Sequence, residues 1–266
     1  MNNDLSVEVM VEAVFFDIDG TLISNETHEA VESTIKALNL LRKKGIKLFI
    51  STGRAKAMLN DVIDFEFDGY ITLNGQYCYD RSGKVIYEGT IEKEDLVPML
   101  EYINKENIAC YFVEDNEVYC NFRNEDMINL ENAIKVFKLP AKDIIIDSNT
   151  KIYQISPCVT EEQEKALVDM MPHTKSTRWH SRCIDLFPIG GTKLNGIQKM
   201  CEYYGFDIAN TMAFGDSDND VEMLSGVGLS VAMGDGKDCA KEAADYITDD
   251  VAKDGIYKAL KHFELI

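Results

Sequence analysis

The sequence predicts a doubly wound α/β fold with a mostly parallel sheet, into which a separate α+β module is inserted. Several short apolar runs show little polar alternation, which is typical of parallel strands buried on both faces. Segments with helical periodicity lie between these runs, and such alternation favours right-handed crossovers. A chain of 266 residues is long enough for a well-buried core and for two domains.

The candidate strands of the parallel sheet lie near the two ends of the chain, and each runs into a polar or glycine-rich segment. They are residues 13–16, 46–50, 69–73, 211–214 and 228–233. In open α/β sheets ligands bind beyond the carboxyl ends of the strands. We therefore expect the polar segments to converge in space.

Helices are expected between these strands. Val31, Ile35, Leu38 and Leu41 follow a helical period, and "RKKG" then places cations in the last turn and Gly45 at the stop. Two further helices are predicted over residues 192–205 and 221–226.

The middle of the chain has a different pattern, with hairpins as well as helices. We expect residues 82–187 to form an α+β cap domain, and residues 1–81 and 188–266 to form the core. Its predicted elements are strands at 84–89 and 151–156, hairpins at 108–122 and 174–187, and helices at 93–107, 125–137 and 160–170. Trp179, the single tryptophan, lies on the second hairpin. It is expected to pack in the core of this domain, and a shelf for substrate is the less favoured alternative.

Charge and cysteine usage exclude several classes of function. A net charge of −19 disfavours nucleic acid and anionic membrane surfaces as partners. The seven cysteines are scattered, with no CxxC pair, which argues against a disulfide framework or zinc site and for reduced, buried thiols. The first residues lack a basic start, and no run approaches the ~20 apolar residues that span a bilayer. The sequence thus favours a cytoplasmic protein.

Paired acidic residues follow two of the predicted strands. The segments "DIDGT" at 17–21 and "GDSDND" at 215–220 place up to five carboxylates at one sheet edge. Unpaired, these groups would repel one another, and several pKa values would rise. A hard cation with oxygen ligands removes the conflict, and Mg²⁺ suits it best because it keeps positions for water or a phosphate oxygen.

The same residue types suit phosphoryl transfer. A strand-end carboxylate such as Asp17 can attack phosphorus, and a second carboxylate two residues on can serve as acid and then base. Gly20 allows a sharp turn that brings backbone amides near a phosphate. Thr52, Gly53 and Lys193 can supply a hydroxyl, a close amide and a positive charge to the phosphoryl oxygens.

With "DIDGT", "STGR" at 51–54, Lys193 and "GDSDND" in this order, the sequence resembles the haloacid dehalogenase (HAD) superfamily of phosphotransferases. The segments "LNG" at 73–75 and "IDLFPIGGTK" at 184–193 resemble its Cof-type branch, which has a C2B-type cap. One departure is Asp235–Gly236, where relatives usually carry an asparagine–alanine pair.

The resemblance implies roles for individual residues. Asp17 would be the nucleophile and Asp19 the general acid and base. Mg²⁺ would be held by Asp17, the backbone carbonyl of Asp19 and Asp216, with Asp220 in support. The phosphate would contact the Ile18 amide, Thr52, Gly53, Lys193 and Asn219. Arg54 would either contact substrate or pair with an acid, and Asp218 is expected to be a solvated loop acid. Asn74 would either shape the site or form a tight turn with Gly75, and the turn is favoured.

The function implied by this resemblance is a Mg²⁺-dependent phosphatase for small phosphorylated metabolites, most of all sugar phosphates, in a monomer or weak homo-oligomer. The cap would exclude water and choose the substrate. A sugar phosphomutase or phosphotransferase on the same scaffold is an alternative, because it shares the nucleophile and the acid/base. A non-catalytic phospho-dependent regulator is a third, although Asp19 argues against it by speeding loss of the phosphoryl group.

Overall fold

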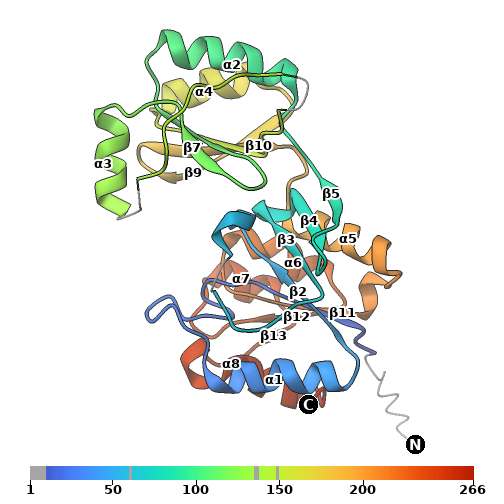
Figure 1. Cartoon of the computed structure of the whole chain (residues 1–266). Coiled ribbons are helices and arrows are strands. Elements are labelled where there is room, and N and C mark those ends of the chain that lie inside the picture. The colour runs from blue at the N-terminus through green and yellow to red at the C-terminus, as the bar shows by residue number, and fades with distance from the viewer. Residues whose placement is uncertain (1–9, 60–61, 135–137, 148–149) are drawn as a thin grey trace, which may run out of the picture. The chain divides into compact units, whose positions relative to one another are not determined.

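The computed structural model describes residues 10–59, 62–134, 138–147 and 150–266. These residues form an eight-stranded and a five-stranded sheet (Figure 1). They divide into two units, and we call them the core unit and the cap unit. The core unit takes the described residues of Met1–Gly53, Asp61–Tyr87 and Thr192–Ile266, and the cap unit those of Arg54–Asn60 and Glu88–Gly191.

The core sheet has the strand order β13-β12-β11-β1-β2-β3-β4-β5. Its strands are β1 (Ala13–Phe16), β2 (Lys47–Ser51), β3 (Gly69–Thr72), β4 (Tyr77–Asp80), β5 (Val85–Glu88), β11 (Thr211–Gly215), β12 (Leu229–Ala232) and β13 (Tyr246–Ile247). Strand β1 pairs in parallel with β2 and β11, and β3 pairs in parallel with β2 and antiparallel with β4. The predicted mostly parallel sheet is thereby confirmed.

The placement of β5 corrects the sequence prediction. The strand expected at 84–89 was assigned to the inserted module, but it lies at the edge of the core sheet. The reason is packing, because Ile86 and Tyr87 lie against the apolar cluster of the core unit. The chain accordingly divides after Tyr87 and after Gly191, rather than at residues 82 and 187.

Helices cover the core sheet, as the doubly wound fold requires. They are α1 (Glu32–Lys43), α5 (Lys193–Tyr204), α6 (Val221–Gly226), α7 (Asp238–Ala243) and α8 (Gly255–His262), with short 3₁₀ turns at Leu73–Gly75, Ile208–Asn210, Asp218–Asp220 and Val251–Lys253. A further 3₁₀ turn at Lys56–Met58 belongs to the cap unit. Phe15 packs in one cluster with Ile197 of α5 and Met223 of α6. Its neighbour Phe16 is also buried and points to the opposite face, and α1 and α8 pack on each other (Figure 1).

The cap sheet has the strand order β7-β6-β8-β10-β9. Its elements are α2 (Lys93–Lys105), β6 (Cys110–Val113), β7 (Val118–Cys120), α3 (Glu125–Ile134), β8 (Gln154–Pro157), α4 (Glu161–Met170), β9 (Thr174–His180) and β10 (Cys183–Pro188). Both predicted hairpins are confirmed, since β6 pairs antiparallel with β7 and β10 pairs antiparallel with β9. The predicted helix at 125–137 corresponds to α3, and its residues 135–137 lie outside the described residues.

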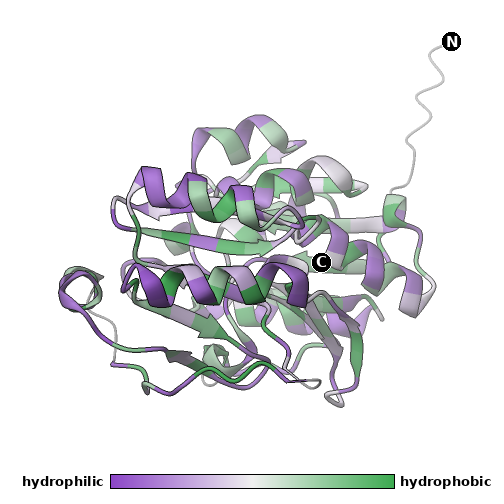
Figure 2. Cartoon of the chain, turned by 90° about the horizontal axis from the view of Figure 1, so that it is seen from above, coloured by the Kyte–Doolittle hydropathy of each residue, from purple (hydrophilic) through white to green (hydrophobic). Residues whose placement is uncertain are grey.

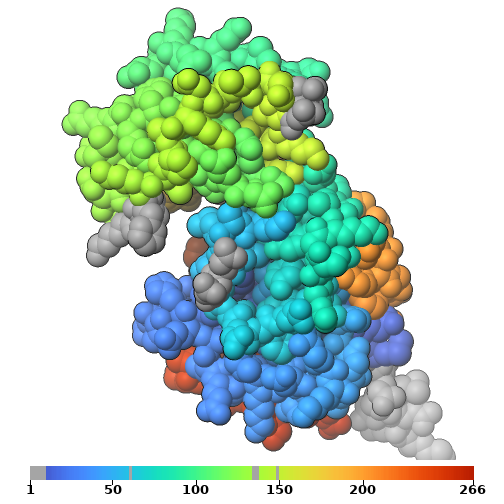
Figure 3. Space-filling model, viewed as in Figure 1, coloured from blue at the N-terminus to red at the C-terminus, as the bar shows by residue number. Residues whose placement is uncertain are grey.

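Apolar residues pack on both faces of the cap sheet. On one face, Met99 of α2 and Leu167 of α4 pack with Ile184 of β10. Elsewhere Met127 of α3 packs with Cys183, at the first residue of β10. In the hydropathy view of Figure 2 the helices carry both hydrophobic (green) and hydrophilic (purple) residues. Figure 3 shows the cap side chains, coloured green to yellow, as a closely packed body.

Two sequence predictions on individual residue types have different outcomes. Six of the seven cysteines are buried and Cys239 is partly exposed, which agrees with the expected buried thiols.

The prediction that Trp179 packs in the core is wrong, because its side chain is 45% exposed. It lies on the edge strand β9, where the neighbouring Arg178 points toward Glu164 of α4 and Trp179 therefore points away from that helix.

Across the described ranges, no helix combines the length and apolar character needed to cross a membrane.

Candidate active site

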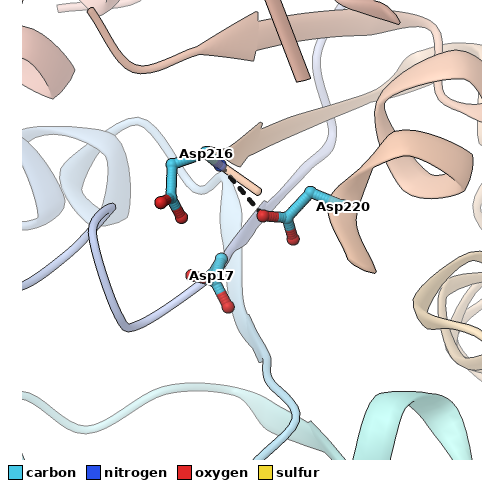
Figure 4. A group of neighbouring side chains, drawn as sticks. All are labelled: Asp17, Asp216 and Asp220. Atoms are coloured by element: carbon cyan, nitrogen blue, oxygen red, sulfur yellow. Dashed lines mark hydrogen bonds between the residues drawn. The ribbon is translucent and has the colours of Figure 1, made fainter. Parts of the chain in front are cut away.

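Three carboxylates meet at the carboxyl edge of the core sheet (Figure 4). Asp17 directly follows β1, and Asp216 directly follows the neighbouring strand β11. Asp220 ends the 3₁₀ turn Asp218–Asp220, which is the next segment of the chain. One oxygen from each group lies within 4.8 Å of the others. The expected convergence of the two acidic motifs is therefore seen in the structure.

Lys193 lies among these carboxylates. It is the first residue of α5, its side chain is buried, and its Nζ donates to Oδ1 of Asp17 and to Oδ1 of Asp220, at 2.6 Å in both cases. The Thr192 hydroxyl caps this helix by accepting the amide of Asn195 at 3.2 Å. The start of α5 thus fixes the ammonium beside the proposed nucleophile.

The Asp220 carboxylate binds both the loop that follows β11 and the Lys193 ammonium. Its Oδ2 accepts the backbone amides of Asp216 at 2.9 Å and of Ser217 at 3.0 Å, while its Oδ1 accepts Lys193. Gly215 lies against this side chain, because an added Cβ there would come within 2.6 Å of the Asp220 Cβ. Asp220 therefore acts mainly by holding Asp216 and Lys193 in place.

The charges at this site do not balance within the protein. Asp17, Asp216 and Asp220 carry two more negative charges than the Lys193 ammonium neutralises. Burial and the neighbouring Asp220 raise the pKa of Asp216 to about 6, although Lys193 opposes the shift. Burial also raises the pKa of Asp17, with Asp220 and Asp216 adding to the shift and Lys193 opposing it. Burial alone would lower the pKa of Lys193, but Asp17 and Asp220 outweigh it and keep the amine protonated.

This imbalance fits a divalent cation. The donor atoms are carboxylate oxygens, which are the ligands that Mg²⁺ prefers, and the excess of two negative charges equals the charge of one such ion. A bound ion would lower the pKa values of Asp17 and Asp216 and so favour their deprotonated state. The residues present therefore fit the cofactor expected from the sequence.

The turn after β1 is closely fitted to Asp216. Gly20 has a φ of 82°, in the left-handed region, and an added Cβ there would lie 2.4 Å from Oδ2 of Asp216. Glycine is therefore required both by the backbone and by the available space. Thr21 donates from its hydroxyl to Oδ1 of Asp216 at 3.3 Å, a contact that the sequence analysis missed. Thr21 is the last residue of the "DIDGT" segment, and this position could have marked it as a site residue.

A second group of predicted residues gathers at the ends of β2 and β3. The amide of Asn74 donates to the carbonyl of Thr52 at 3.0 Å, and Asn219 Nδ2 donates to Oδ1 of Asn74 at 3.0 Å. An added Cβ on Gly53 would be 3.2 Å from the same Asn74 oxygen. Asn74 itself has a φ of 53° and occupies the tight turn that was expected. It also links Gly53 to Asn219.

The remaining predicted residues lie in several environments. Ile18 is buried and Asp19 is partly exposed, both in the turn after β1, and the Asp19 carboxylate is outside the group of three. Arg54 belongs to the cap unit. Asp218 is an exposed loop acid, as expected, and pairs with Lys237.

The loop that contains Asp235 and Gly236 contacts the backbone of Asp216. The amide of Lys237 donates to the carbonyl of Asp216 at 2.7 Å, and an added Cβ on Gly236 would lie 2.8 Å from that carbonyl oxygen. Asp235 accepts the amide of Val251 at 3.4 Å. This loop therefore positions the backbone of Asp216, a role that sequence spacing alone did not reveal.

Comparison with known proteins gives a consistent picture. The family described as haloacid dehalogenase-like hydrolase matches residues 14–260. The chain is 29% identical to the 5-amino-6-(5-phospho-D-ribitylamino)uracil phosphatase YcsE of Bacillus subtilis, over 97% of this chain and 98% of that protein. Among solved structures, the HAD subclass IIB sugar phosphatase BT4131 is 38% identical with a TM-score of 0.79, over 96% of this chain and 100% of that chain. The HAD phosphatase BT1666 of Bacteroides thetaiotaomicron is 31% identical with a TM-score of 0.86, over 98% of both chains.

Proposed function

This chain belongs to the haloacid dehalogenase-like hydrolases and is a phosphoric monoester hydrolase, and we propose that it uses Mg²⁺ to hydrolyse small phosphorylated metabolites, above all sugar and polyol phosphates. The observation that carries the proposal is the Asp17 carboxylate, fixed by Lys193 at a strand end and facing Asp216.

In the first step, a carboxylate oxygen of Asp17 attacks phosphorus, and the bond from phosphorus to the leaving oxygen breaks. Lys193 holds Asp17 through its Oδ1, so that the carboxylate is oriented before the substrate arrives. Asp19, two residues on, protonates the leaving oxygen as the alcohol departs. The product of this step is an acyl-phosphate on Asp17.

In the second step, water hydrolyses the acyl-phosphate. Asp19, now a carboxylate, takes a proton from the water as the water oxygen attacks phosphorus, and Asp17 is regenerated with release of inorganic phosphate. Thr52, the Gly53 amide and Asn219 would bind the phosphoryl oxygens. The hydrogen bond of Asn219 to Asn74 and the close approach of Gly53 to Asn74 support this assignment.

Asp17, the backbone carbonyl of Asp19 and Asp216 would hold Mg²⁺, with Asp220 in support. When bound, the ion would supply positive charge to the phosphoryl oxygens and neutralise the excess carboxylates. Thr21 and the amide of Lys237 would keep Asp216 in position for this role.

The substrate class follows from the relatives. One is named a sugar phosphatase, and another acts on a phosphorylated ribityl compound, so both names describe hydroxyl-rich phosphomonoesters. We assign the choice of leaving group to the cap unit, which would form the α+β specificity domain.

The experiment that tests this function is phosphate release from a panel of sugar, polyol and other metabolite phosphates, with Mg²⁺ and with excess chelator. We expect turnover with Mg²⁺, and loss of at least about 10²-fold with chelator because the carboxylates would lose their neutralising ion. An isomerised sugar phosphate without free phosphate would instead establish a mutase. A long-lived phosphorylated form without turnover would favour the regulator.

The affinity for Mg²⁺ should depend on pH. Because the pKa of Asp216 is raised to about 6, protons compete with the ion below that pH. Protonation of Asp216 should therefore weaken the apparent affinity by up to about tenfold per pH unit below pH 6, and protonation of Asp17, whose pKa is also raised, should add to this loss. Calorimetric titration of Mg²⁺ from pH 5 to pH 8 measures this. An affinity that is constant between pH 5 and pH 7 would show that Asp216 is not a ligand.

A further inference from the structure

Two buried cysteines of the cap unit lie opposite each other on neighbouring strands. Cys158 directly follows β8, Cys183 is the first residue of β10, and these two strands pair antiparallel. The amide of Val159 donates to the carbonyl of Arg182 at 3.0 Å, so the pairing continues past the end of β8. One step inward from this bond along each strand are the two cysteines, which therefore face each other directly.

The kind of pairing brings these two side chains close together. Residue pairs in an antiparallel ladder alternate between hydrogen-bonded and non-hydrogen-bonded positions, and side chains are closer at the non-hydrogen-bonded ones. Val159 and Arg182 form a hydrogen-bonded pair, so the cysteines next to them occupy a non-hydrogen-bonded position. The next such pair on the same face is Ser156 and Asp185, whose side chains are bonded across the strands at 2.6 Å.

The two thiols contact each other within an apolar cluster. They pack there with Met127 and Leu130 of α3, and both are free thiols in this structure. A hydrogen bond between them holds the pKa of Cys158 below its ordinary value and raises the pKa of Cys183. Because the thiolate is the reactive form of cysteine, Cys158 is the better nucleophile of the two.

Among the cap cysteines, each of which the structure describes, this pair alone is placed for a covalent bond. Cys120 lies on β7, which β6 separates from β8. Two strand spacings amount to about 9.6 Å, beyond the ~7 Å between Cα atoms that a disulfide tolerates. Cys110 lies on β6 but packs in the cluster with α2 and α4, on the face opposite Cys158.

The strand geometry also suits a bond that is reversible. Disulfides tolerate Cα separations of about 4.4–6.8 Å, and directly opposed non-hydrogen-bonded residues lie about 4.5 Å apart. A bond between Cys158 and Cys183 therefore needs no change in strand pairing. Because the separation is at the short end of the range, the bond would be strained and more easily reduced than a relaxed one.

The pair lies next to an exposed turn, which gives a small reagent a way to reach it. Ser181 and Arg182 are exposed, and Cys183 follows them directly. An exposed ion pair between Arg182 and Asp126 joins this turn to α3, which covers the thiols. Exposed ion pairs contribute little free energy, and short segments open locally without unfolding of the whole domain.

We propose that Cys158 and Cys183 form a thiol–disulfide redox pair that is oxidised by low-molecular-weight disulfides and that stabilises the cap unit when oxidised. The Cys158 thiolate attacks one sulfur of the reagent and releases a first small thiol. Cys183 then attacks the Cys158 sulfur of this mixed disulfide and releases the second. The two protein thiols lose two electrons and two protons, and the reagent gains them as two thiols.

The new bond would stabilise the cap by closing a loop of the chain. This loop contains α4 and β9, so the bond would reduce the entropy of the unfolded segment. The inference does not depend on the proposed hydrolysis, since it concerns the cap unit alone and its tests need no substrate.

The first test is oxidation of the full-length protein with oxidised glutathione, followed by alkylation and mass spectrometry of tryptic peptides. We expect residues 152–165 and 183–193 to be linked, and the count of thiols titrated in denaturant to fall by two from seven. Dithiothreitol without denaturant should restore all seven. A full count after oxidation, a link to another cysteine, or a bond that resists dithiothreitol would overturn the proposal.

Two alanine variants test the roles of the individual thiols. In Cys183→Ala the exchange should stop at the first step, so that Cys158 carries one glutathione. An unmodified Cys158 in this variant would show that it is not the attacking thiol. Cys110→Ala is the matched control, since it removes a fully buried cap thiol from the neighbouring strand and should form the same linked peptide as wild type.

A stability measurement tests the consequence of the bond. Trp179 lies on β9 inside the closed loop and is the single tryptophan, so its fluorescence in urea follows unfolding of the cap. Oxidation should raise the unfolding midpoint of wild type and of Cys110→Ala by roughly 1 M urea, and should not raise that of Cys183→Ala. A linked wild type whose midpoint is unchanged or lower would overturn the stabilising role.

Discussion

Replacement of Asp17 by Asn abolishes Mg²⁺-dependent phosphate release, by about 10⁴-fold or more, which is the scale of losing a nucleophile. The amide has nearly the shape of the carboxylate, but it cannot attack phosphorus to form an acyl-phosphate. Steady-state phosphate release on the best substrate of the panel measures the loss. Mass spectrometry of the quenched wild-type enzyme should show one phosphoryl group that is absent from the variant.

The same substitution should not destabilise the fold. Burial raises the pKa of Asp17, so its ionisation in the folded state costs free energy that is present once the pH exceeds the usual pKa of the carboxyl group. Neutral Asn removes that cost at pH 7, and its Oδ1 can still accept Lys193. The Tm without metal should therefore be equal to that of wild type or higher, which separates loss of chemistry from loss of structure.

Asp218→Asn is the matched control for this experiment. Asp218 lies in the neighbouring acidic loop, is exposed, and pairs with Lys237 outside the group of three carboxylates. Its neutralisation should leave phosphate release within about twofold, because exposed ion pairs contribute little. If Asp17→Asn kept more than a small fraction of the activity, covalent catalysis by Asp17 would be excluded.

The position of the site could be predicted because the ends of buried parallel strands can be recognised in the sequence. Strands buried on both faces read as continuous apolar runs, so the points where β1 and β11 end are visible in the sequence. Asp17 and Asp216 come directly after them, and parallel neighbours bring those points together. The Lys193 contact with Asp17 spans 176 residues and was foreseen only as a charge near phosphate, not as a direct bond to the nucleophile.

The wrong and missing predictions have one physical cause. A local sequence pattern does not show which other elements pack against the segment. The β5 segment is strand-like in either sheet, and packing of Ile86 and Tyr87 decided in favour of the core unit. Strand β13 has two residues, too few for a periodic signal. Trp179 was expected to pack in the core, but its exposure depends on which face of β9 the helix α4 covers. Thr21 and the loop at 235–237 act through tertiary contacts with Asp216, which spacing does not encode.

Replacement of Lys193 by Met should lower both stability and activity. The ammonium is fully buried and donates to two carboxylates at 2.6 Å, so its removal leaves Asp17 and Asp220 without their cation. Removing one partner of a buried ion pair costs about 3–5 kcal/mol, which denaturant unfolding without metal would measure. Phosphate release should fall by about 10³-fold, since the nucleophile loses its orientation and the phosphoryl group loses a nearby positive charge.

Lys199→Met is the control, because it makes the same substitution on the same helix. Lys199 pairs with Glu202 on the surface of α5, and its loss should leave the free energy of unfolding nearly unchanged, because exposed ion pairs contribute little. Two readouts then distinguish an electrostatic role of Lys193 from a purely structural one. Lys193 lowers the pKa values of Asp17 and Asp216, so without it the acidic limb of the pH–rate profile should move to higher pH.

Mg²⁺ should also raise the Tm of Lys193→Met more than that of wild type, since the ion would then neutralise carboxylates that the protein no longer balances. A variant with unchanged unfolding free energy and an unchanged acidic limb would show that the ammonium is not what holds these carboxylates.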